Sequence, residues 1–511
     1  MGRTVVALIV SLWMIPVSIL VNRIVPHSYM DEIFHIPQVQ QYCKGNFRSW
    51  DPMITTPPGL YYLSLAHIAS LFPGMIWVQR ISSFSDLCST AILRSVNGAL
   101  AIVCSILIYE IITQLKPALD RRKAALNTVV LSLYPLHWFF TYLYYTDVAS
   151  LTVFLAMYLT SLKKNYFLSA LMGALAVCIR QTNIIWMLFV ACDGVIDMLL
   201  VNRQSVGIQK SDISIAEKNR ISPKDNFSAK PGVRRRKMKG TQDVPFPTVT
   251  GGNEATLSGS HLSGLFDEFQ YIIIQAWHLK WELMVSFTPF ILVLGAFVSF
   301  VYWNGSVVLG AKEAHAVSPH FAQTMYFAMV SALFSAPFHF TLGHATALLR
   351  SFFKIRPLSF FLGFVILTAG VLSVHFFSIA HPYLLADNRH YPFYIWRKVI
   401  NAHQLMKYFL VPFYVYSWLS ILHILGKARS RIWVLAYFLA CAAVLVPTPL
   451  VEFRYYTIPF FIFMLNSGIE EISKWLLIAI LYVVVNSFTM YMFLFRSFEW
   501  SHESGVQRFI W

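Results

Sequence analysis

The chain has 511 residues, of which 57% are hydrophobic, 16% aromatic and only 13% charged, and its formal net charge is +16. A soluble globular protein carries about 25% charged residues, so this composition excludes an ordinary soluble domain and indicates a polytopic membrane protein. In such a chain the excess positive charge is expected to show which loops face the cytosol, and it does not indicate binding of nucleic acid.

Apolar runs close to the roughly 20 residues needed to cross a bilayer recur along the whole chain. The first run is longer than the core of a signal peptide and no A-x-A-like cleavage site follows it, so we predict a retained helix. The fold class is therefore an all-α polytopic membrane protein with about 11 to 14 transmembrane helices. The predicted spans are 4–22, 95–115, 125–144, 148–162, 166–183, 184–201, 284–303, 320–341, 358–377, 404–425, 431–447, 456–469 and 475–494.

The apolar stretch 56–74 lies between Pro58 and Pro73 and is short for a span. If it crossed, the basic segment 116–125 would lie on the same side as the loop after the first helix. The positive-inside rule favours the alternative, in which this stretch dips into the membrane or lies on its surface. The N-terminus is then cytosolic, more than half of the 40 lysines and arginines lie in cytosolic segments, and the C-terminus lies on the other side.

A segment of different composition divides the chain. Residues 203–280 are rich in Ser, Gly, Lys and Arg, contain "VRRRKMKG" and are predicted to form a basic, mostly disordered cytosolic loop. The predicted organisation around this loop is an N-terminal transmembrane module with one long non-cytosolic loop, 1–202 with loop 23–94, and a C-terminal transmembrane module with three such loops, 281–511 with loops 304–319, 378–403 and 448–457.

Two adjacent acids, Asp31 and Glu32, follow the first span at the head of the long loop. If "MDEIFHIPQVQQY" is helical, Asp31, His35, Gln38 and Tyr42 share one face, which predicts an amphipathic surface helix whose polar stripe carries an acid and an imidazole. Helix capping is the alternative, because an acid near a helix N-terminus is favourable through the macrodipole alone. The spacing leaves both interpretations open.

Cations gather in the loop "HPYLLADNRHYPFYIWRK", which contains His381, Asp387, Arg389, His390 and Arg397 among aromatic residues. Cations at a membrane surface often reach toward lipid phosphate. These lie on the side where positive charge is disfavoured, and aromatic rings beside Arg and His suit a site for lipid phosphate or sugar.

Two further arginines lie at the non-cytosolic ends of predicted spans. Arg454 is close to Glu452 in "LVEFRYYTIPF", where a local ion pair of little energetic value is the alternative. Arg180 lies in "CIRQTNIIW" at the end of a short helix, where burial of a charge is costly. The sequon Asn304-Gly305-Ser306 falls on the same side and is a candidate for glycosylation.

Motifs of several other chemistries are absent from the sequence. It contains no Gly-rich phosphate loop, H-E-x-x-H, G-x-S-x-G or nicotinamide fingerprint, and no C-x-x-C pair that would suggest zinc. The sequence therefore requires neither a metal nor another cofactor.

Five stretches together resemble the dolichyl-phosphate-glucose-dependent α-1,2-glucosyltransferases, which add the terminal glucose to the lipid-linked oligosaccharide in the endoplasmic reticulum. The resemblance spans residues 29 to 461 and omits the basic loop. The stretches are "YMDEIFHIPQVQQYC", "WDPMITTPPGLYYLS", "CIRQTNIIW", "HPYLLADNRHYPFYIWRK" and "LVEFRYYTIPFF".

The resemblance implies a GT-C glycosyltransferase with an acidic motif in its first lumenal loop. The donor would be dolichyl phosphate glucose, and the acceptor the diglucosylated oligosaccharide on dolichyl pyrophosphate. A β-linked donor that gives an α-linked product implies inversion, which needs one general base and cations for the leaving phosphate. The resemblance assigns the role of the base to Asp31, with Glu32 as the second choice. His35 would orient the carboxylate.

The same resemblance implies that the phosphate candidates are Arg180, His381, Arg389, His390, Arg397 and Arg454. The protein would lie in the membrane of the endoplasmic reticulum with a lumenal active site. An oxidising lumen would permit a disulfide between Cys43 and Cys88.

A transporter or channel accessory subunit is the alternative from a different class. Transporters often show inverted repeats and ionisable groups near the midplane, whereas the acids and most candidate cations here lie on one side. A mannosyltransferase that uses dolichyl phosphate mannose on the same fold is excluded only by the motif match.

Overall fold

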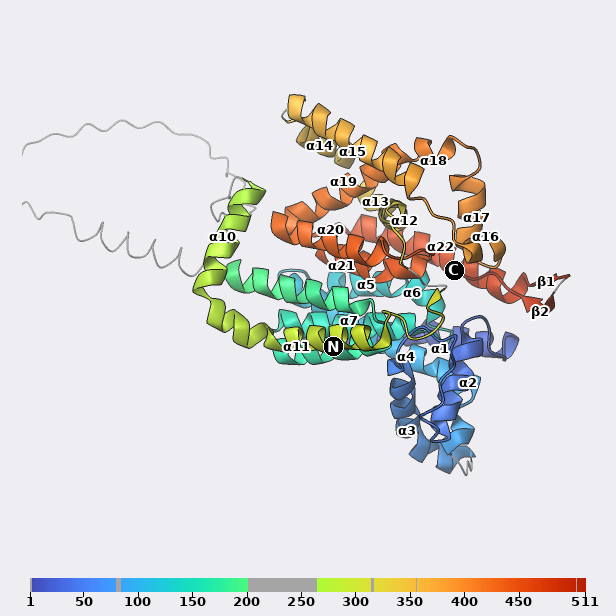
Figure 1. Cartoon of the computed structure of the whole chain (residues 1–511). Coiled ribbons are helices and arrows are strands. Elements are labelled where there is room, and N and C mark those ends of the chain that lie inside the picture. Colours follow the sequence, from blue (N-terminus) through green and yellow to red (C-terminus); the bar gives the residue numbers. More distant parts are fainter. Residues whose placement is uncertain (1, 80–83, 201–263, 314–316, 355, 502) are drawn as a thin grey trace, which may run out of the picture. The chain divides into compact units, whose positions relative to one another are not determined.

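The computed structural model describes residues 2–79, 84–200, 264–313, 317–354, 356–501 and 503–511. Helices make up most of these residues, and the strands among them form one antiparallel pair near the C-terminus (Figure 1). The elements are α1 (Gly2–Ile24), α2 (Glu32–Cys43), α3 (Gly59–Gln79), η1 (Phe84–Leu87), α4 (Thr90–Leu115), α5 (Arg121–Ser132), α6 (Pro135–Phe140), α7 (Thr146–Leu162), α8 (Tyr166–Ile179), α10 (Leu265–His278), α11 (Lys280–Asn304), α12 (Ala322–Phe334), α13 (Ala336–His339), α14 (Leu342–Phe352), α15 (Arg356–Phe376), α16 (Pro382–Ala386), α17 (Tyr391–Ile395), η3 (Trp396–Ile400), α18 (Met406–Phe409), α19 (Val411–Ala428), α20 (Arg431–Leu445), η4 (Phe453–Tyr456), α21 (Thr457–Asn466), α22 (Ile472–Phe495), β1 (Phe498–Trp500) and β2 (Glu503–Gln507).

Seven helices in the described part of the chain are long and apolar enough to cross a membrane, so the protein is a multi-pass, all-α membrane protein. They are α1, α4, Asn183–Leu200, α11, α15, Met406–Ala428 and α22. Each coincides with one of the thirteen predicted spans. The other six predicted spans contain helices of 17 residues or fewer, so length and composition alone do not identify these as spans.

Two of these six regions differ from the prediction for clear physical reasons. The span predicted over 125–144 is broken because α5 ends at Ser132 and α6 begins at Pro135, and a proline disfavours the helical conformation of the residue before it. The span predicted over 456–469 contains α21, which has ten residues and is about 15 Å long. All ten residues are buried, so protein and not lipid surrounds this helix.

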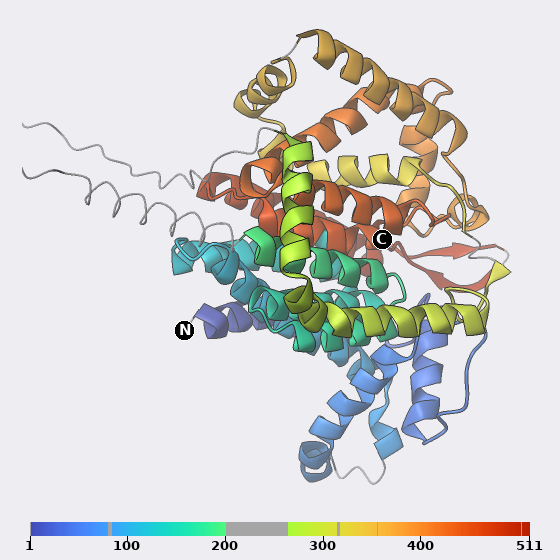
Figure 2. The same cartoon turned by 60° about the vertical axis from the view of Figure 1, so that its left-hand side comes forward.

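The chain termini mark opposite faces of the helix bundle, which we call the N face and the C face (Figure 2). On the N face Arg3 pairs with Glu110, which also lies 3.8 Å from Lys163, and Arg429 binds Asn466 at 2.6 Å. Contacts on the C face join segments that are distant in sequence: Gln181 to Thr55, the backbone of His320 to Val446, and Tyr29 to Arg508.

The region after α1 lies on the C face and is anchored to the bundle. The stretch predicted over 56–74 forms α3, which is longer than predicted at 21 residues and does not have the direction of the bundle helices in either view (Figures 1 and 2). Gly59 starts α3 against the backbone of α8: a Cβ atom there would lie 2.4 Å from the carbonyl oxygen of Cys178, so only glycine fits. A shared core of α2, α3, α4, α7 and α8 side chains surrounds this contact.

Of the predicted basic loop 203–280, residues 203–263 lie outside the described part of the chain. Its last part is helical and not irregular, because α10 covers Leu265–His278. The described residues form two units, Met1–Gly194 with Lys280–Trp511, and Val195–Leu279. The first unit contains residues of both predicted transmembrane modules and all the site residues discussed below.

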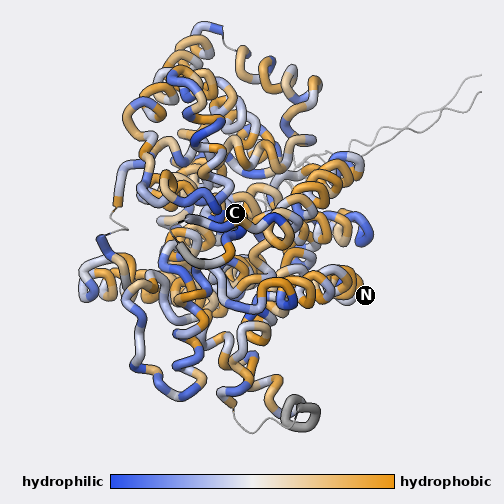
Figure 3. Tube along the Cα trace, turned by 90° about the vertical axis from the view of Figure 1, so that its right-hand side faces the viewer, coloured by the Kyte–Doolittle hydropathy of each residue, from blue (hydrophilic) through white to orange (hydrophobic). Residues whose placement is uncertain are grey.

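Large apolar side chains lie exposed along α11, α15 and α22, including Leu292 at 67%, Phe364 at 70% and Val484 at 60%. Exposed apolar surface of this extent marks contact with lipid or another partner. Figure 3 looks onto the C face and shows hydrophilic segments gathered around the C-terminus. Hydrophilic segments thus gather on the C face of a bundle with an apolar surface (Figure 3).

Candidate active site

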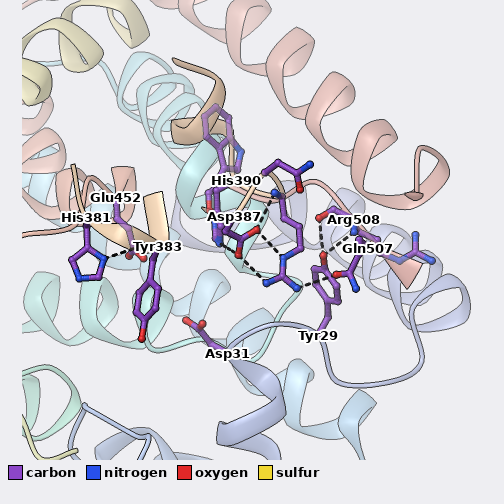
Figure 4. A network of polar contacts seen from close by, with 12 residues as sticks. Tyr29, Asp31, His381, Tyr383, Asp387, His390, Glu452, Gln507 and Arg508 are labelled. Atoms are coloured by element: carbon purple, nitrogen blue, oxygen red, sulfur yellow. Dashed lines mark hydrogen bonds and ion pairs between the residues drawn. The ribbon is translucent and has the colours of Figure 1, made fainter. Parts of the chain in front are cut away.

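Asp31 is the residue immediately before α2, on the C face (Figure 4). Its backbone N–H donates to the hydroxyl of Tyr145 at 3.2 Å. Met30 before it has a φ of 56°, a left-handed conformation that costs a non-glycine residue about 1 to 2 kcal/mol. Local strain and a long-range hydrogen bond thus hold this acid where 41% of its side chain stays exposed.

Arg454, in η4, connects Asp31 to other carboxylates. Its Nη1 atom donates to Asp31 Oδ2 at 2.9 Å and lies 3.7 Å from Asp147 Oδ2, and its Nη2 atom lies 2.8 Å from Glu452 Oε2. Its guanidinium also lies over the Tyr145 ring at 5.2 Å. The Glu452 pair predicted as a local contact is present, but the same arginine reaches an acid 423 positions away.

Asp147 extends this chain of charges to Arg180. The Arg180 Nη1 atom donates to Asp147 Oδ1 at 2.6 Å, and its guanidinium lies 5.7 Å from the centre of the Tyr455 ring. Three carboxylates and two guanidiniums therefore meet in these contacts, so this group of described residues carries a net negative charge when all are ionised. An additional cation or a rearrangement is needed before it can hold an anion well.

Sequence reasoning did not identify Asp147. The predicted spans 125–144 and 148–162 left it in a short turn. The available signal was an acid inside the aromatic and apolar stretch "TYLYYTDVASL", where an unpaired charge would be costly.

Charges around Asp31 and His35 determine their protonation. Partial burial raises the pKa of Asp31, but the charge and hydrogen bond of Arg454, together with the neighbouring His35 and His390, outweigh it, and the net pKa lies below the ordinary value. Burial lowers the pKa of His35, and the opposing charge of Asp31 restores only part of it. Near neutral pH Asp31 is therefore a carboxylate and His35 a neutral imidazole.

Glu32 points into the protein and has no exposed surface. Its Oε1 atom accepts from Arg94 Nε at 2.8 Å and Tyr144 N at 2.6 Å, and its Oε2 atom from Arg94 Nη2 at 2.6 Å and Tyr29 N at 3.1 Å. Arg94 is equally buried and donates further to Val25, His27 and Asn22. Glu32 has no lone pair directed at a pocket, so its geometry suits a structural anchor and not a base.

The helix predicted around His35 exists, but its polar stripe is not exposed. Gln38 is 3% exposed and binds the backbone of Ser49 and Asp51, and Tyr42 is 4% exposed. His35 Nδ1 pairs with Tyr61 OH at 2.7 Å instead of with Asp31. The face that α2 exposes carries Ile33 at 55%, because the loop that follows α2 covers the polar one.

The loop after α15 places its charged residues in different environments. Arg389 donates to both oxygens of Asp387, at 2.9 and 2.8 Å, and His390 Nε2 lies 3.7 Å from Asp387 Oδ2 (Figure 4). Burial opposes the ionisation of Asp387, but the bonds from Arg389 and the charge of His390 lower its pKa below the ordinary value. Arg397 is exposed and lies over Phe393 at 6.0 Å, away from these groups.

A pocket of about 170 Å³ brings the two regions together. Its lining includes Asp31, Asp387, His390, Glu452 and Arg454. Pro392 and Val451 also line a second pocket of about 130 Å³, which is almost wholly apolar. A third pocket of about 330 Å³ includes Arg180 and His381 and shares Tyr383 with the first. Of the six predicted phosphate candidates, the first pocket thus collects His390 and Arg454, and the third collects Arg180 and His381.

The predicted disulfide and the predicted glycosylation site can also be located in the structure. A disulfide joins Cys43 to Cys88 and ties the end of α2 to the segment after η1. Asn304 ends α11, and its Nδ2 atom donates to the backbone of Ser306 and Val308, each at 2.8 Å. Within the described residues no group of three or more His, Cys, Asp or Glu side chains is placed to hold a metal ion.

Comparisons with known proteins agree with the motifs. The sequence model of the DIE2/ALG10 family matches residues 25–465. A relative from Arabidopsis thaliana is 58% identical over 514 aligned residues, which cover 100% of both chains, and one from Homo sapiens is 34% identical over 96% of this chain and 94% of its own. Another, from Drosophila melanogaster, is 29% identical over 94% and 93%. All three are named Dol-P-Glc:Glc(2)Man(9)GlcNAc(2)-PP-Dol alpha-1,2-glucosyltransferase. No solved structure matches the chain. The chain belongs to the DIE2/ALG10 family.

Proposed function

We propose that this protein transfers glucose from dolichyl phosphate glucose to the diglucosylated oligosaccharide on dolichyl pyrophosphate and forms the terminal α-1,2 linkage. The family and the names of its relatives support the reaction and both substrates. The observation that carries the proposal is the first pocket, where the partly exposed Asp31 carboxylate lies with the Arg454 guanidinium and the His390 imidazole beside an apolar pocket.

The reaction needs one base and a stabilised leaving group. Asp31 takes the proton from the acceptor hydroxyl, whose oxygen forms the new bond to the anomeric carbon of glucose. The bond between that carbon and the phosphate oxygen breaks in the same step, and dolichyl phosphate leaves with the electron pair. Cations preorganised around the leaving phosphate stabilise its developing charge. A single in-line displacement inverts the anomeric centre.

Arg454 couples donor binding to the base. Its guanidinium bonds Asp31 and Glu452, and its bond to Asp31 helps to keep the Asp31 pKa low. A donor phosphate competes for the same guanidinium, because arginine binds phosphate in a bidentate manner. When Arg454 turns to the phosphate, Asp31 loses its strongest cationic neighbour and becomes a better base. The donor thereby supplies the anion that frees the carboxylate.

The neighbouring pockets suit the rest of each substrate. The apolar pocket, lined by side chains such as Met329, Trp396 and Leu410, opens beside the phosphate position and suits the first isoprene units of the donor lipid. The third pocket mixes threonines, Gln181 and His381 with apolar side chains and suits the outer sugars of the acceptor.

The C face is assigned to the lumen of the endoplasmic reticulum and the N face to the cytosol. Lys116, Lys163, Lys427 and Lys474 lie in connections or helix ends of the N face, in keeping with the positive-inside rule. The disulfide in the first loop suits an oxidising compartment. Protease protection of a tag inserted in 203–263 tests this assignment, and protection of the tag in sealed microsomes would reverse it.

The decisive experiment is an assay of the purified protein with synthetic dolichyl phosphate glucose and a diglucosylated acceptor. We expect one glucose to be added, with an α-1,2 linkage identified by glycosidase digestion. Dolichyl phosphate mannose serves as the matched donor control. Equal transfer of mannose, or no transfer of glucose, would contradict the proposal.

A further inference from the structure

The last five residues, Gln507–Trp511, form a tail on the C face. The tail begins at Gln507, the last residue of β2, which lies opposite Phe498 in the β1–β2 hairpin. Instead of leaving the protein surface, this tail crosses the C face. Gln507 is 5% and Ile510 1% exposed.

The tail binds the loop that carries Arg389 and His390 along its backbone. Ile510 N donates to Arg389 O at 2.9 Å, and Tyr391 N donates to Ile510 O at 3.0 Å. These two bonds form a parallel bridge between His390 and Ile510. The backbone on both sides of His390 is therefore held by the tail.

The side chains of Arg389 and His390 also bind the tail. Arg389 Nη1 donates to Gln507 Oε1 at 2.9 Å, and its guanidinium lies 4.6 Å from the centre of the Trp500 ring in the hairpin. His390 Nδ1 lies 3.0 Å from the main-chain oxygen of Trp511. Because a main-chain oxygen only accepts, Nδ1 carries a proton in this contact, and Nε2 lies on the side of Asp387.

The tail also reaches the other two segments that form the pocket. Tyr29, two residues before Asp31, donates its hydroxyl to Arg508 O and accepts from Arg508 N, both at 2.7 Å. The Trp511 ring lies 6.3 Å from that of Phe453, the residue next to Arg454. One short segment thus touches all three loops that supply pocket residues.

We propose that Gln507–Trp511 is a positioning element of the donor site, which sets the orientation of Arg389 and His390 and the spacing of the three loops. The proposal rests on the proposed function for its role in catalysis. No residue of the tail lines the pocket, so its action is through the residues that do.

The first test uses Gln507. Gln507→Leu removes the acceptor for Arg389 and keeps the size of the side chain, whereas Gln507→Glu keeps an acceptor. We expect Gln507→Leu to raise KM for dolichyl phosphate glucose by about 10-fold to 100-fold, the size expected for one hydrogen bond to a charged group, with kcat less affected. Gln507→Glu should restore most of this loss, and Val506→Ala, an exposed neighbour in β2, should match the unaltered protein.

The second test measures position without activity. Deletion of Trp511 removes the oxygen that binds His390, and hydrogen exchange of the peptide 385–393 should become faster, while exchange in α12 stays the same. This readout does not depend on glucose transfer. It therefore distinguishes failure of this proposal from failure of the proposed function, which would appear as an inactive unaltered protein.

Thermal unfolding in detergent identifies variants that have lost the fold. If the deletion of Trp511 unfolds the protein, Gln507→Leu provides the milder change for the same exchange measurement. Unchanged exchange in 385–393 together with an unchanged donor KM would overturn the proposal. So would faster exchange with an unchanged donor KM in folded variants, because the tail would then be purely structural.

Discussion

Two ion pairs lie side by side at the start of α2 and have opposite characters. Glu32 and Arg94 are both fully buried, and each oxygen of the carboxylate accepts two hydrogen bonds. Asp31 and Arg454 form a pair in which the acid remains 41% exposed and faces a pocket. Saturation by partners, and not the type of residue, separates a structural acid from a candidate base.

Asp31→Asn should have the largest effect on activity. Loss of the base should reduce kcat by about 10²-fold to 10⁴-fold, the range for general-base catalysis. The thermal midpoint should change little, because a partly exposed ion pair contributes at most about 1 kcal/mol. Asp86→Asn, an exposed acid of the same loop, is the matched control. Near-normal transfer by Asp31→Asn would refute the assignment of the base.

Glu32→Gln should reverse this pattern. It leaves Arg94 without an ionised partner in a buried site, which should cost about 3 to 5 kcal/mol of unfolding free energy. The fraction that remains folded should keep near-normal kcat. Urea unfolding and the glucose assay on the same sample measure both quantities. A stable but inactive variant would show that Glu32, and not Asp31, takes the proton.

Arg454→Met should lower kcat/KM by about 10²-fold, the size expected for loss of one preorganised cation. It should also raise the Asp31 pKa, because burial then acts without the guanidinium that opposes it. A base with a raised pKa loses its charge at a higher pH, so the acid limb of the pH profile should move upward. Arg454→Lys keeps the charge and should move it less. If the acid limb lies at the same pH in the unaltered protein, Arg454→Met and Arg454→Lys, then Arg454 does not influence the pKa of the base.

Asp147→Asn should have the smallest effect, roughly a 10-fold rise in donor KM, the size of one hydrogen bond to a charged group. The change removes the charge that Arg180 and Arg454 share while keeping the size of the side chain. Asp120→Asn, an exposed acid before α5, is the control. An unchanged KM would show that Glu452 and Asp31 hold Arg454 by themselves.

The sequence predicted the fold correctly where a long apolar run identifies a membrane-spanning helix by its composition. In the described part of the chain, all seven helices long enough to cross a membrane coincide with predicted spans. Short segments were harder, because apolarity does not distinguish lipid from protein surroundings. The wholly buried α21 and the break between α5 and α6 at Pro135 show this limit.

For the site, five motifs in order identify the family, and local patterns single out Asp31, Arg180, His390 and Arg454 as candidates for a chemical role. These signals are local, since a charge or a histidine next to an apolar run is costly wherever the chain folds. Only the folded structure shows that Arg94 and two backbone N–H groups saturate Glu32, that Asp147 joins two arginines, and that the tail at Gln507–Trp511 binds the loop of His390. The physical reason is that these roles depend on partners tens to hundreds of positions away, and no local pattern of residue types records which of them will meet.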